Sequence, residues 1–254
     1  MKVYKHIALA SLIIGIVLCI VGFFMNGLGE LPDETQKLSR YVTIRSYGKA
    51  RNVSTELSVD NNCDLSLELS AINGTIKYYD GEVIKVKADN VDSDYDFKYD
   101  GMKATISFDG VNNKNKKQAG NVTLYLPRNI RFNSVGLDFD ASNITIEDLQ
   151  CNQLDLESDA SKVTIKHLQV DEKTSVDNDM GDLRLNYLNT NSFDIENDMG
   201  NVKATMAETR NQYHVDQDGN LSSINVSKTD EVVGNKKISI DTDLGNVTIH
   251  FEGE

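Results

Sequence analysis

An aspartate recurs down the second half of this chain at nearly constant spacing. The intervals are 19, 20, 19, 20 and 25 residues, and the six positions are Asp140, Asp159, Asp179, Asp198, Asp218 and Asp243. The surrounding sequences resemble one another, as VGLDFDASNITI and ISIDTDLGNVTI illustrate. A fixed period of this length is typical of chains that fold as a stack of repeated units. This period constrains the fold more than any other feature.

Apolar and acidic residues alternate ahead of each aspartate. Counted from the aspartate as position 0, position −3 is aliphatic in all copies: Leu137, Leu156, Val176, Ile195, Val215 and Ile240. Position −2 is acidic in all copies: Asp138, Glu157, Asp177, Glu196, Asp216 and Asp241. Alternation with period two predicts a strand that turns its apolar side chains to a core and its acidic side chains to water.

A tight turn and a second strand follow each aspartate. Position +2 is serine or glycine in most copies, and aspartate followed by a small residue suits a turn. Apolar residues at +4 and +6 mark the second strand, and the copy at Asp218 is irregular there by one residue. A further apolar mark at +9 comprises Leu149, Leu168, Leu188 and Ala207.

Such a unit cannot bury its apolar side alone, so the copies must stack. Parallel stacking predicts an all-β, single-handed β-solenoid of 19–20-residue repeats over residues 134–251, with an irregular β part before them. A β-sandwich of antiparallel strands is the alternative, but sandwich strands need not match column by column. The segment Leu65–Tyr78 reads as a degenerate copy of the repeat.

One apolar segment near the N-terminus differs from the rest of the chain. Residues 7–25 carry no charge and are long enough to span a bilayer, which takes about 20 residues. Because Lys2 and Lys5 precede them, the N-terminus is expected in the cytoplasm. A cleaved signal peptide is the alternative, since Gly27 and Gly29 are small, although its apolar region would be shorter. The expected organisation is a cytoplasmic end at 1–6, a single-pass anchor at 7–25, a linker at 26–40 and an extracytoplasmic domain at 41–254.

Charge and cysteine content limit the partners and the chemistry. The formal net charge of −13 argues against nucleic acid and against an electrostatic grip on anionic lipid. Outside the apolar segment, Cys63 and Cys151 could form one disulfide. Cys151 stands at an apolar position of its repeat, so a buried free thiol is the alternative.

The stacked carboxylates raise the question of what neutralises them. In register, successive rungs lie about 4.8 Å apart, where two unit charges repel by roughly 0.9 kcal/mol in a water-like dielectric. Ca²⁺, which binds clusters of oxygen atoms, would offset this repulsion. The alternative is a solvated acidic face screened by salt and by Lys162, Arg184 and Lys203. The candidate metal ligands are Asp140, Asp159, Asp179 and Asp198, together with Asp138, Glu157, Asp177 and Glu196.

No pattern of residues predicts catalysis. The four histidines, His6, His167, His214 and His250, stand in unrelated contexts, and no nucleophile–histidine spacing or phosphate-binding loop occurs. We therefore expect no enzyme, no catalytic or cofactor-binding residue, and no cofactor beyond the Ca²⁺ considered above.

The repeats resemble the putative-adhesin domain family of bacterial surface proteins. The residues that carry the resemblance are Leu126-Pro127, Met180-Gly181-Asp182-Leu183, Met199-Gly200-Asn201-Val202 and Leu244-Gly245-Asn246-Val247. The turns at Asp140 and Asp159 depart from it by lacking the glycine. The resemblance covers about Val42 to Phe251 and implies a β-rich surface domain of unknown function, typical of Gram-positive bacteria with one membrane anchor.

These features predict a non-enzymatic, membrane-anchored surface or binding module of a bacterial envelope, for which the resemblance implies adhesion. The alternatives are a regulatory partner in envelope-stress sensing and a β-helix enzyme that acts on cell-wall polysaccharide. The expected partners are the membrane, through residues 7–25, and a protein or glycan ligand that the sequence does not identify. A homodimer through the terminal solenoid strand, Asn246–Phe251, is also expected because an open strand edge invites pairing.

Overall fold

The computed structural model of the chain describes residues 50–253, apart from 114–115, 118 and 230. All of them belong to one compact unit, Tyr47–Glu254. The segments expected at 1–6, 7–25 and 26–40 lie outside the described residues. Within the described part, no helix is long and apolar enough to cross a membrane.

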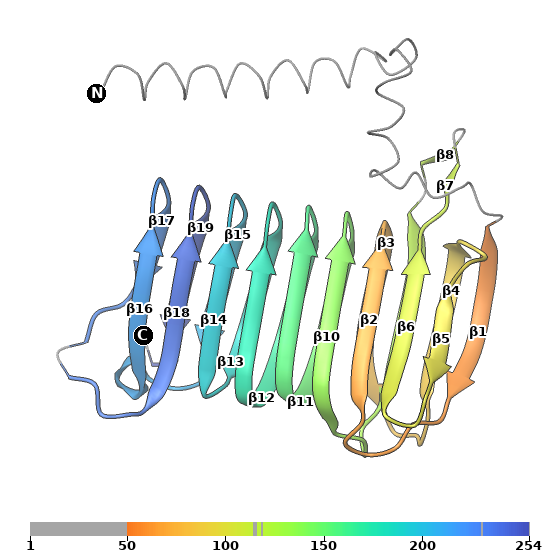
Figure 1. Cartoon of the computed structure of the whole chain (residues 1–254), viewed down its shortest axis with the longest axis horizontal. Helices are drawn as coiled ribbons and strands as arrows, with labels where there is room; N and C mark the ends of the chain where they lie inside the picture. Colours follow the sequence, from red (N-terminus) through yellow and green to blue (C-terminus); the bar gives the residue numbers. More distant parts are fainter. Residues whose placement is uncertain (1–49, 114–115, 118, 230, 254) are drawn as a thin grey trace, which may run out of the picture. The chain divides into compact units, whose positions relative to one another are not determined.

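The chain winds into a stack of coils, and each coil consists of two strands joined by a tight corner (Figure 1). Stacking gives two faces, which β11 and β12 connect because each runs from one face into the other. The acidic face contains, in spatial order, β5 (Asp96–Tyr99), β6 (Lys103–Asp109), β2 (Asp64–Ser70), β10 (Phe132–Asp140), the ends of β11 (Asn143–Asp159) and β12 (Lys162–Asn178), β14 (Ser192–Asn197), β18 (Lys236–Thr242) and β16 (Tyr213–Gly219).

The second face lies behind the acidic face. Its strands are, in spatial order, β1 (Arg51–Leu57), β4 (Ile84–Val91), β9 (Gly120–Pro127), β3 (Ile72–Tyr79), the beginnings of β11 and β12, β13 (Asp182–Asn189), β15 (Asn201–Met206), β19 (Asn246–Phe251) and β17 (Ser223–Val226). The hairpin of β7 (Asn112–Asn113) and β8 (Lys116–Lys117) forms a sheet of its own, and a short 3₁₀ turn, η3 (Arg210–Gln212), precedes β16.

The strands of the repeats pair in parallel, as a solenoid requires. Leu137 stands opposite Leu156, Leu156 opposite Val176, and Val176 opposite Ile195. The predicted all-β solenoid is therefore correct and the antiparallel sandwich is wrong. Among the residues that the structure describes, antiparallel pairing is confined to the irregular N-terminal part, where β1, β4 and β5 cover the end of the stack.

The spatial order of the coils departs from their order in the sequence at both ends. The β2–β3 coil lies between the β6–β9 coil and the coil that β10 begins. At the other end, β18 and β19 insert between β14–β15 and β16–β17. The expectation that Asn246–Phe251 forms the open edge is therefore wrong, because β19 is paired on both sides. The exposed end is formed by β16 and β17.

The register of the copy at Asp218 differs by two residues from the register that the sequence predicts. Asp218 stands opposite Asp241, in the −2 column, and Asn220 donates a hydrogen bond of 2.8 Å from Nδ2 to Oδ1 of Asp243. Asn220 therefore occupies position 0, and Ile224 and Val226 then fall at +4 and +6. The second strand of this copy is then regular. Val215 stands opposite Ile238 at position −5, and Gln217 stands opposite Ile240 at position −3, so the expectation that Val215 belongs to the aliphatic −3 column is wrong.

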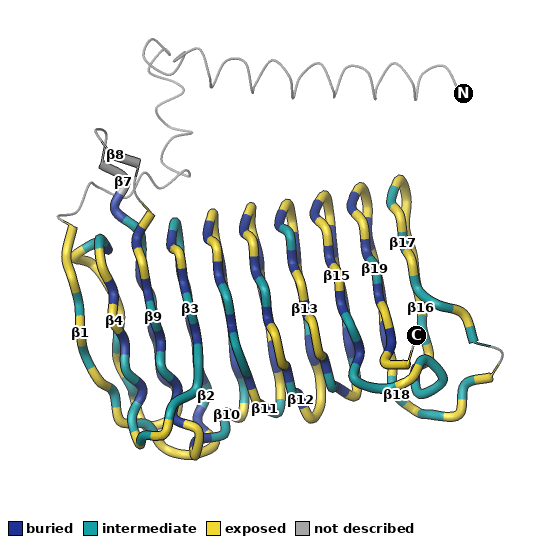
Figure 2. Tube along the Cα trace, turned by 180° about the vertical axis from the view of Figure 1, so that it is seen from behind, coloured by how far each residue is buried: buried dark blue, intermediate teal, exposed yellow. Residues whose placement is uncertain are grey.

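The core fills the space between the two faces. Figure 2 shows buried stretches that recur in the strands from coil to coil. Leu137, Leu156 and Ile240 of the −3 column are all buried. At the +9 mark Leu149, Leu168 and Leu188 are buried in register, but the next coil places Met206 opposite Leu188 where Ala207 was expected. Cys63 and Cys151 are buried free thiols, so they form no disulfide in this structure.

Candidate functional site

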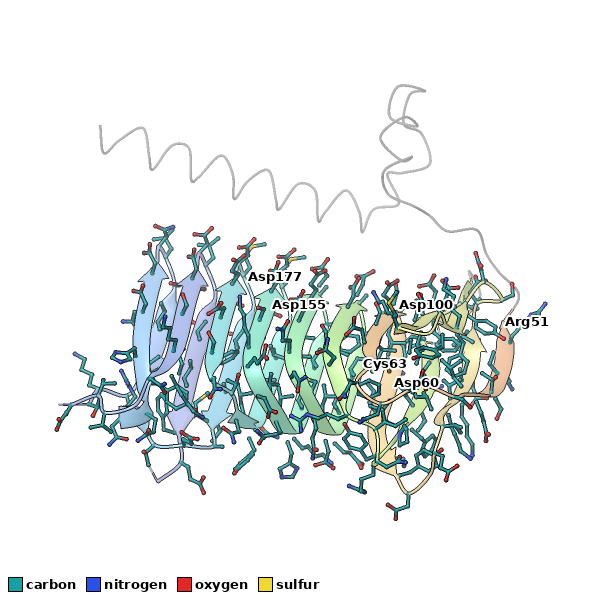
Figure 3. All side chains as sticks on the ribbon, turned by 60° about the horizontal axis from the view of Figure 1, so that its bottom comes forward. Arg51, Asp60, Cys63, Asp100, Asp155 and Asp177 are labelled. Carbon is teal, nitrogen blue, oxygen red and sulfur yellow. The ribbon has the colours of Figure 1, made fainter. Side chains whose placement is uncertain are left out.

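The acidic columns lie in register on the outer side of the acidic face. Asp138 stands opposite Glu157, Glu157 opposite Asp177, and Asp177 opposite Glu196. In the position 0 column, Asp140 likewise stands opposite Asp159. Asp155 and Asp177, on neighbouring strands of this face, are labelled in Figure 3. The predicted carboxylate ladder therefore exists.

Crowding of the carboxylates raises several of their pKa values. Loss of hydration raises the pKa of Asp138, Glu157, Asp159 and Asp177, and neighbouring negative charges add to the effect. For Asp159 the main neighbouring charge is Asp179, one coil further along. The ladder thus costs folding free energy whenever its members are all ionised.

The cations expected to screen this ladder lie elsewhere. Lys162, Arg184 and Lys203 are outward residues of β12, β13 and β15 on the second face, where Arg184 pairs with Asp182 at 3.2 Å. The acidic face has its own ion pair between Lys173 and Asp194 at 2.8 Å.

The proposed metal ligands stand in rows and do not converge. Among the described residues, no group of three or more histidine, cysteine, aspartate or glutamate side chains is placed to hold a metal ion. Side chains on a flat parallel sheet point away from it side by side, which separates their oxygens by about the strand spacing. A Ca²⁺ site on this face remains a prediction.

The corners of the coils are built by two different polar ladders. Where position +2 is serine, the hydroxyl bonds the neighbouring coil: Ser142 accepts from the Ile72 N–H at 3.0 Å, and Ser161 donates to the Phe139 carbonyl at 2.9 Å. These turns place Ala141 and Ala160 in the left-handed region, each with a φ of 48°.

Where position +2 is glycine, position −1 carries a buried amide or hydroxyl. Asn178 donates to Asn197 at 2.7 Å, and Asn197 donates to Thr242 at 3.0 Å. A Cβ on Gly200 would collide with the Asn178 amide and stand 2.7 Å from the Gly181 carbonyl oxygen. The glycines are therefore required by the amide ladder beneath them.

A shallow groove opens where β11, β12 and β13 leave the second face. Its volume is about 240 Å³. The Nδ1 atom of His167 lies 3.2 Å from Oδ1 of Asp148, and its ring lies 5.9 Å from the ring of Tyr187 at an angle of 58°. Asp148, His167 and Tyr187 form one row of the groove, and Gln150 and Gln169 lie in the opposite row. Leu149 and Leu168 line the groove between the two rows.

This groove was missed from the sequence although a signal was present. Asp148, His167 and Tyr187 are position +8 of three successive repeats. The glutamines, with Asn189, are position +10 of the same three repeats. His167 therefore belongs to a column of the repeat.

Hydrogen bonds hold one side of the groove in place. Asn189 donates from Nδ2 to Oε1 of Gln169 at 3.1 Å and accepts from Lys236 at 3.2 Å. Lys236 is itself fixed by Glu208 at 2.7 Å. At the other end of the same row, the hydroxyl of Tyr78 accepts from the Gln150 N–H at 3.1 Å, and burial raises the pKa of Tyr78 to about 12.

Comparison with known proteins agrees with the fold. The model of the family described as Toastrack DUF4097 matches residues 111–254, more than half of the 254-residue chain. A comparison with curated protein sequences gave no match.

Several solved structures are similar, with low identity and low TM-scores. A putative cell adhesion protein from Clostridium sporogenes is 10% identical with a TM-score of 0.46, and the match covers 80% of this chain and 100% of that one. A putative adhesin from Bacteroides fragilis is 11% identical with a TM-score of 0.43, covering 78% and 97%. A putative lipid binding protein from Parabacteroides distasonis is 8% identical with a TM-score of 0.31, covering 80% and 98%.

Proposed function

We propose that this chain, which belongs to the Toastrack DUF4097 family, is a non-enzymatic binding module displayed on a bacterial surface. The observation that carries the proposal is the groove of Asp148, His167 and Tyr187, which sits on a rigid stack of paired strands. Binding residues that project from regular elements are held more precisely than residues on loops. An apolar floor with a few polar groups around it is typical of a recognition site.

The make-up of the groove favours binding over catalysis. His167 and Asp148 form a hydrogen-bonding pair, but the lining contains no serine or cysteine that the histidine could activate. The carboxylates of the acidic face stand side by side in rows along the stack, whereas glycoside hydrolysis needs two carboxyl groups that flank the scissile bond in different protonation states. Adhesion is the form of binding that we propose.

The proposed location is the outer side of the cell membrane, with residues 7–25 as a single-pass anchor and the N-terminus in the cytoplasm. The length and neutrality of the apolar segment and the lysines before it support this orientation. The remainder of the chain would then lie outside the cell.

Sedimentation with isolated bacterial cell walls tests the proposal. The full-length protein is expected to co-sediment with the walls in a saturable way, whereas an unrelated protein of similar negative charge stays in solution. Equal sedimentation of the two proteins contradicts specific binding.

A pull-down from membranes distinguishes a regulatory role from surface binding. Residues 7–25 are either retained or replaced by another apolar helix, and capture of a partner that depends on the native segment favours the envelope-stress alternative.

A further inference from the structure

We infer that the groove between the +8 and +10 columns binds one residue of a neutral saccharide. The inference rests on the proposed binding function and assigns it a site and a ligand class. The +8 row consists of Asp148, His167 and Tyr187, and the +10 row of Gln150, Gln169 and Asn189. Figure 2 shows β11, β12 and β13, which carry both rows, as neighbouring coils of the stack.

The groove combines an aromatic surface with hydrogen-bonding groups of both kinds. Tyr187 is 44% exposed, so one part of its ring is open to a ligand. A sugar ring has an apolar C–H face and a rim of hydroxyls, and an aromatic ring suits the first of these. The Asp148 carboxylate accepts hydrogen bonds, and the amide of Gln150 both donates and accepts them, which suits the hydroxyl rim.

The polar groups of the groove are available to a ligand. In the described part of the chain, the side-chain amide of Gln150 and the hydroxyl of Tyr187 have no hydrogen-bond partner. By contrast, Gln169 is held by Asn189 at 3.1 Å, and Asn189 by Lys236. Some polar groups of the groove are thus fixed in advance while others are free to bond, which lowers the ordering cost of binding.

Other ligand classes fit this groove less well. An anionic ligand would meet the Asp148 carboxylate on a chain with a net charge of −13. An extended peptide would need an unpaired strand edge, but β12 is paired with β11 and β13, and β13 continues to pair with β15. A volume of about 240 Å³ is below the usual range for drug-sized ligands and suits one small ring.

Histidine NMR of the full-length protein tests the inference. The chain has 4 histidines, so the ring signals of His167 can be assigned with the variant His167→Gln. Cellobiose, maltose, lactose and chitobiose serve as probes. At least one probe is expected to shift the His167 signals saturably while those of His214 and His250 stay in place. No saturable shift with any of the four sugars overturns the inference.

A variant pair separates recognition from folding. Tyr187→Ala should weaken binding of the active sugar about tenfold, because it removes the aromatic surface. Asn186→Ala changes the preceding exposed residue of β13, which is not part of the lining, and should leave affinity unchanged. Equal affinities of Tyr187→Ala and the wild type, at unchanged melting temperature, overturn the saccharide site.

Sedimentation with cell walls distinguishes failure of the saccharide site from failure of the proposed binding function. If the wild type binds walls and Tyr187→Ala binds them equally well, the groove is not the site, although the chain is still a binding module. If the wild type fails to sediment with walls, the proposed surface binding is overturned, whereas the saccharide site still stands or falls with the saturable His167 shift. Loss of wall binding in Tyr187→Ala, with competition by the same sugar that shifts His167, supports both.

Discussion

At the scale of single residues, the outward and inward columns have opposite effects on stability. The inward columns bury aliphatic side chains from coil to coil, and each buried group adds apolar area to the core. The outward acidic columns place like charges opposite one another, and loss of hydration together with these neighbouring charges raises the pKa values of Glu157 and Asp177. The corner ladders are neutral and bond the side-chain N–H groups of Asn178 and Asn197, for which they need glycine at specific positions.

The substitution Glu157→Gln should stabilise the protein at neutral pH. Loss of hydration and neighbouring charges raise the pKa of Glu157 in the folded state, so folded protein holds more protons than unfolded protein between about pH 4 and that raised pKa, and stability falls as the pH rises through this window. Removing the charge should raise the melting temperature by about 1–2 °C at pH 7 and have little effect near pH 3. Thermal unfolding at both pH values checks this, with Glu82→Gln in an exposed loop as the control.

A stabilisation of Glu157→Gln that is equal at the two pH values would contradict repulsion as its cause. The same result for Glu82→Gln would instead indicate a general effect of net charge on this acidic chain.

The substitution Gly200→Ala should be strongly destabilising. The added Cβ would overlap the Asn178 amide and crowd the Gly181 carbonyl, so the corner must shift or the amide ladder must break. Overpacking of this kind costs about 1–3 kcal/mol of unfolding free energy. Gly136→Ala is the matched control, because its nearest neighbour beyond the adjacent residues is the Leu65 carbonyl at 4.0 Å. Denaturant unfolding should show a large loss for the first variant only, and equal losses would refute the ladder as the cause.

At the scale of elements, parallel pairing with both neighbours is what holds each coil in place. A two-strand coil has no core of its own, so it is stable only against the coils on either side. The strand pairs β18–β19 and β16–β17 illustrate this point because their order in space is the reverse of their order in the chain. The connection between them must leave the stack and return to it.

Removal of the terminal coil should leave a folded protein. Met206 stands opposite Leu188 and Lys237 opposite Ser192, so a deletion of residues 209–235 leaves three residues between Met206 and Lys237. The same number separates Leu188 from Ser192. The deletion therefore reproduces an ordinary coil connection, and we expect a cooperative unfolding transition at a lower temperature, because Tyr213 no longer covers Phe251.

Truncation after residue 235 is the comparison for that deletion. It removes fewer residues but takes away β18 and β19, the pairing partners of β16 and β17. This variant should aggregate or unfold non-cooperatively. If circular dichroism melts show that truncation is tolerated better than the internal deletion, the spatial order of the coils is wrong.

At the scale of the whole molecule, both faces and both ends of the stack differ from one another. The N-terminal end is covered by the antiparallel strands β1, β4 and β5, whereas β16 and β17 form a parallel edge at the other end. The edge is a site for pairing with another chain. It also carries Asp216 and Asp218 on the acidic face, so two copies that meet there repel.

A homodimer through β16 and β17 should therefore depend on salt. Screening of the aspartates shortens the range of their repulsion, which is about 10 Å in 0.1 M salt and about 3 Å in 1 M salt. Light scattering over a range of protein concentration should show dimers that become more abundant as salt is raised. A monomer under all these conditions contradicts edge pairing.

The sequence by itself determined the repeat, the strands and the outward acidic columns. These follow from local chemistry, because alternation of apolar and acidic residues selects the buried side of a strand and aspartate with a small residue selects a turn. The degenerate copy at Leu65–Tyr78 was also recognisable, and it folds as β2 and β3. The family resemblance was carried by the same short turn motifs.

Only the tertiary structure decided which coils are neighbours and which side chains meet. Identical columns fit one another in more than one stacking order, so the sequence favoured neither the insertion of β18–β19 nor the position of Asn220. The groove at His167 needed the same information, because its rows come from three repeats and become a site only when their register is fixed. Contacts between repeats are set by packing along the stack, and the spacing of the repeats does not determine which coils pack against each other.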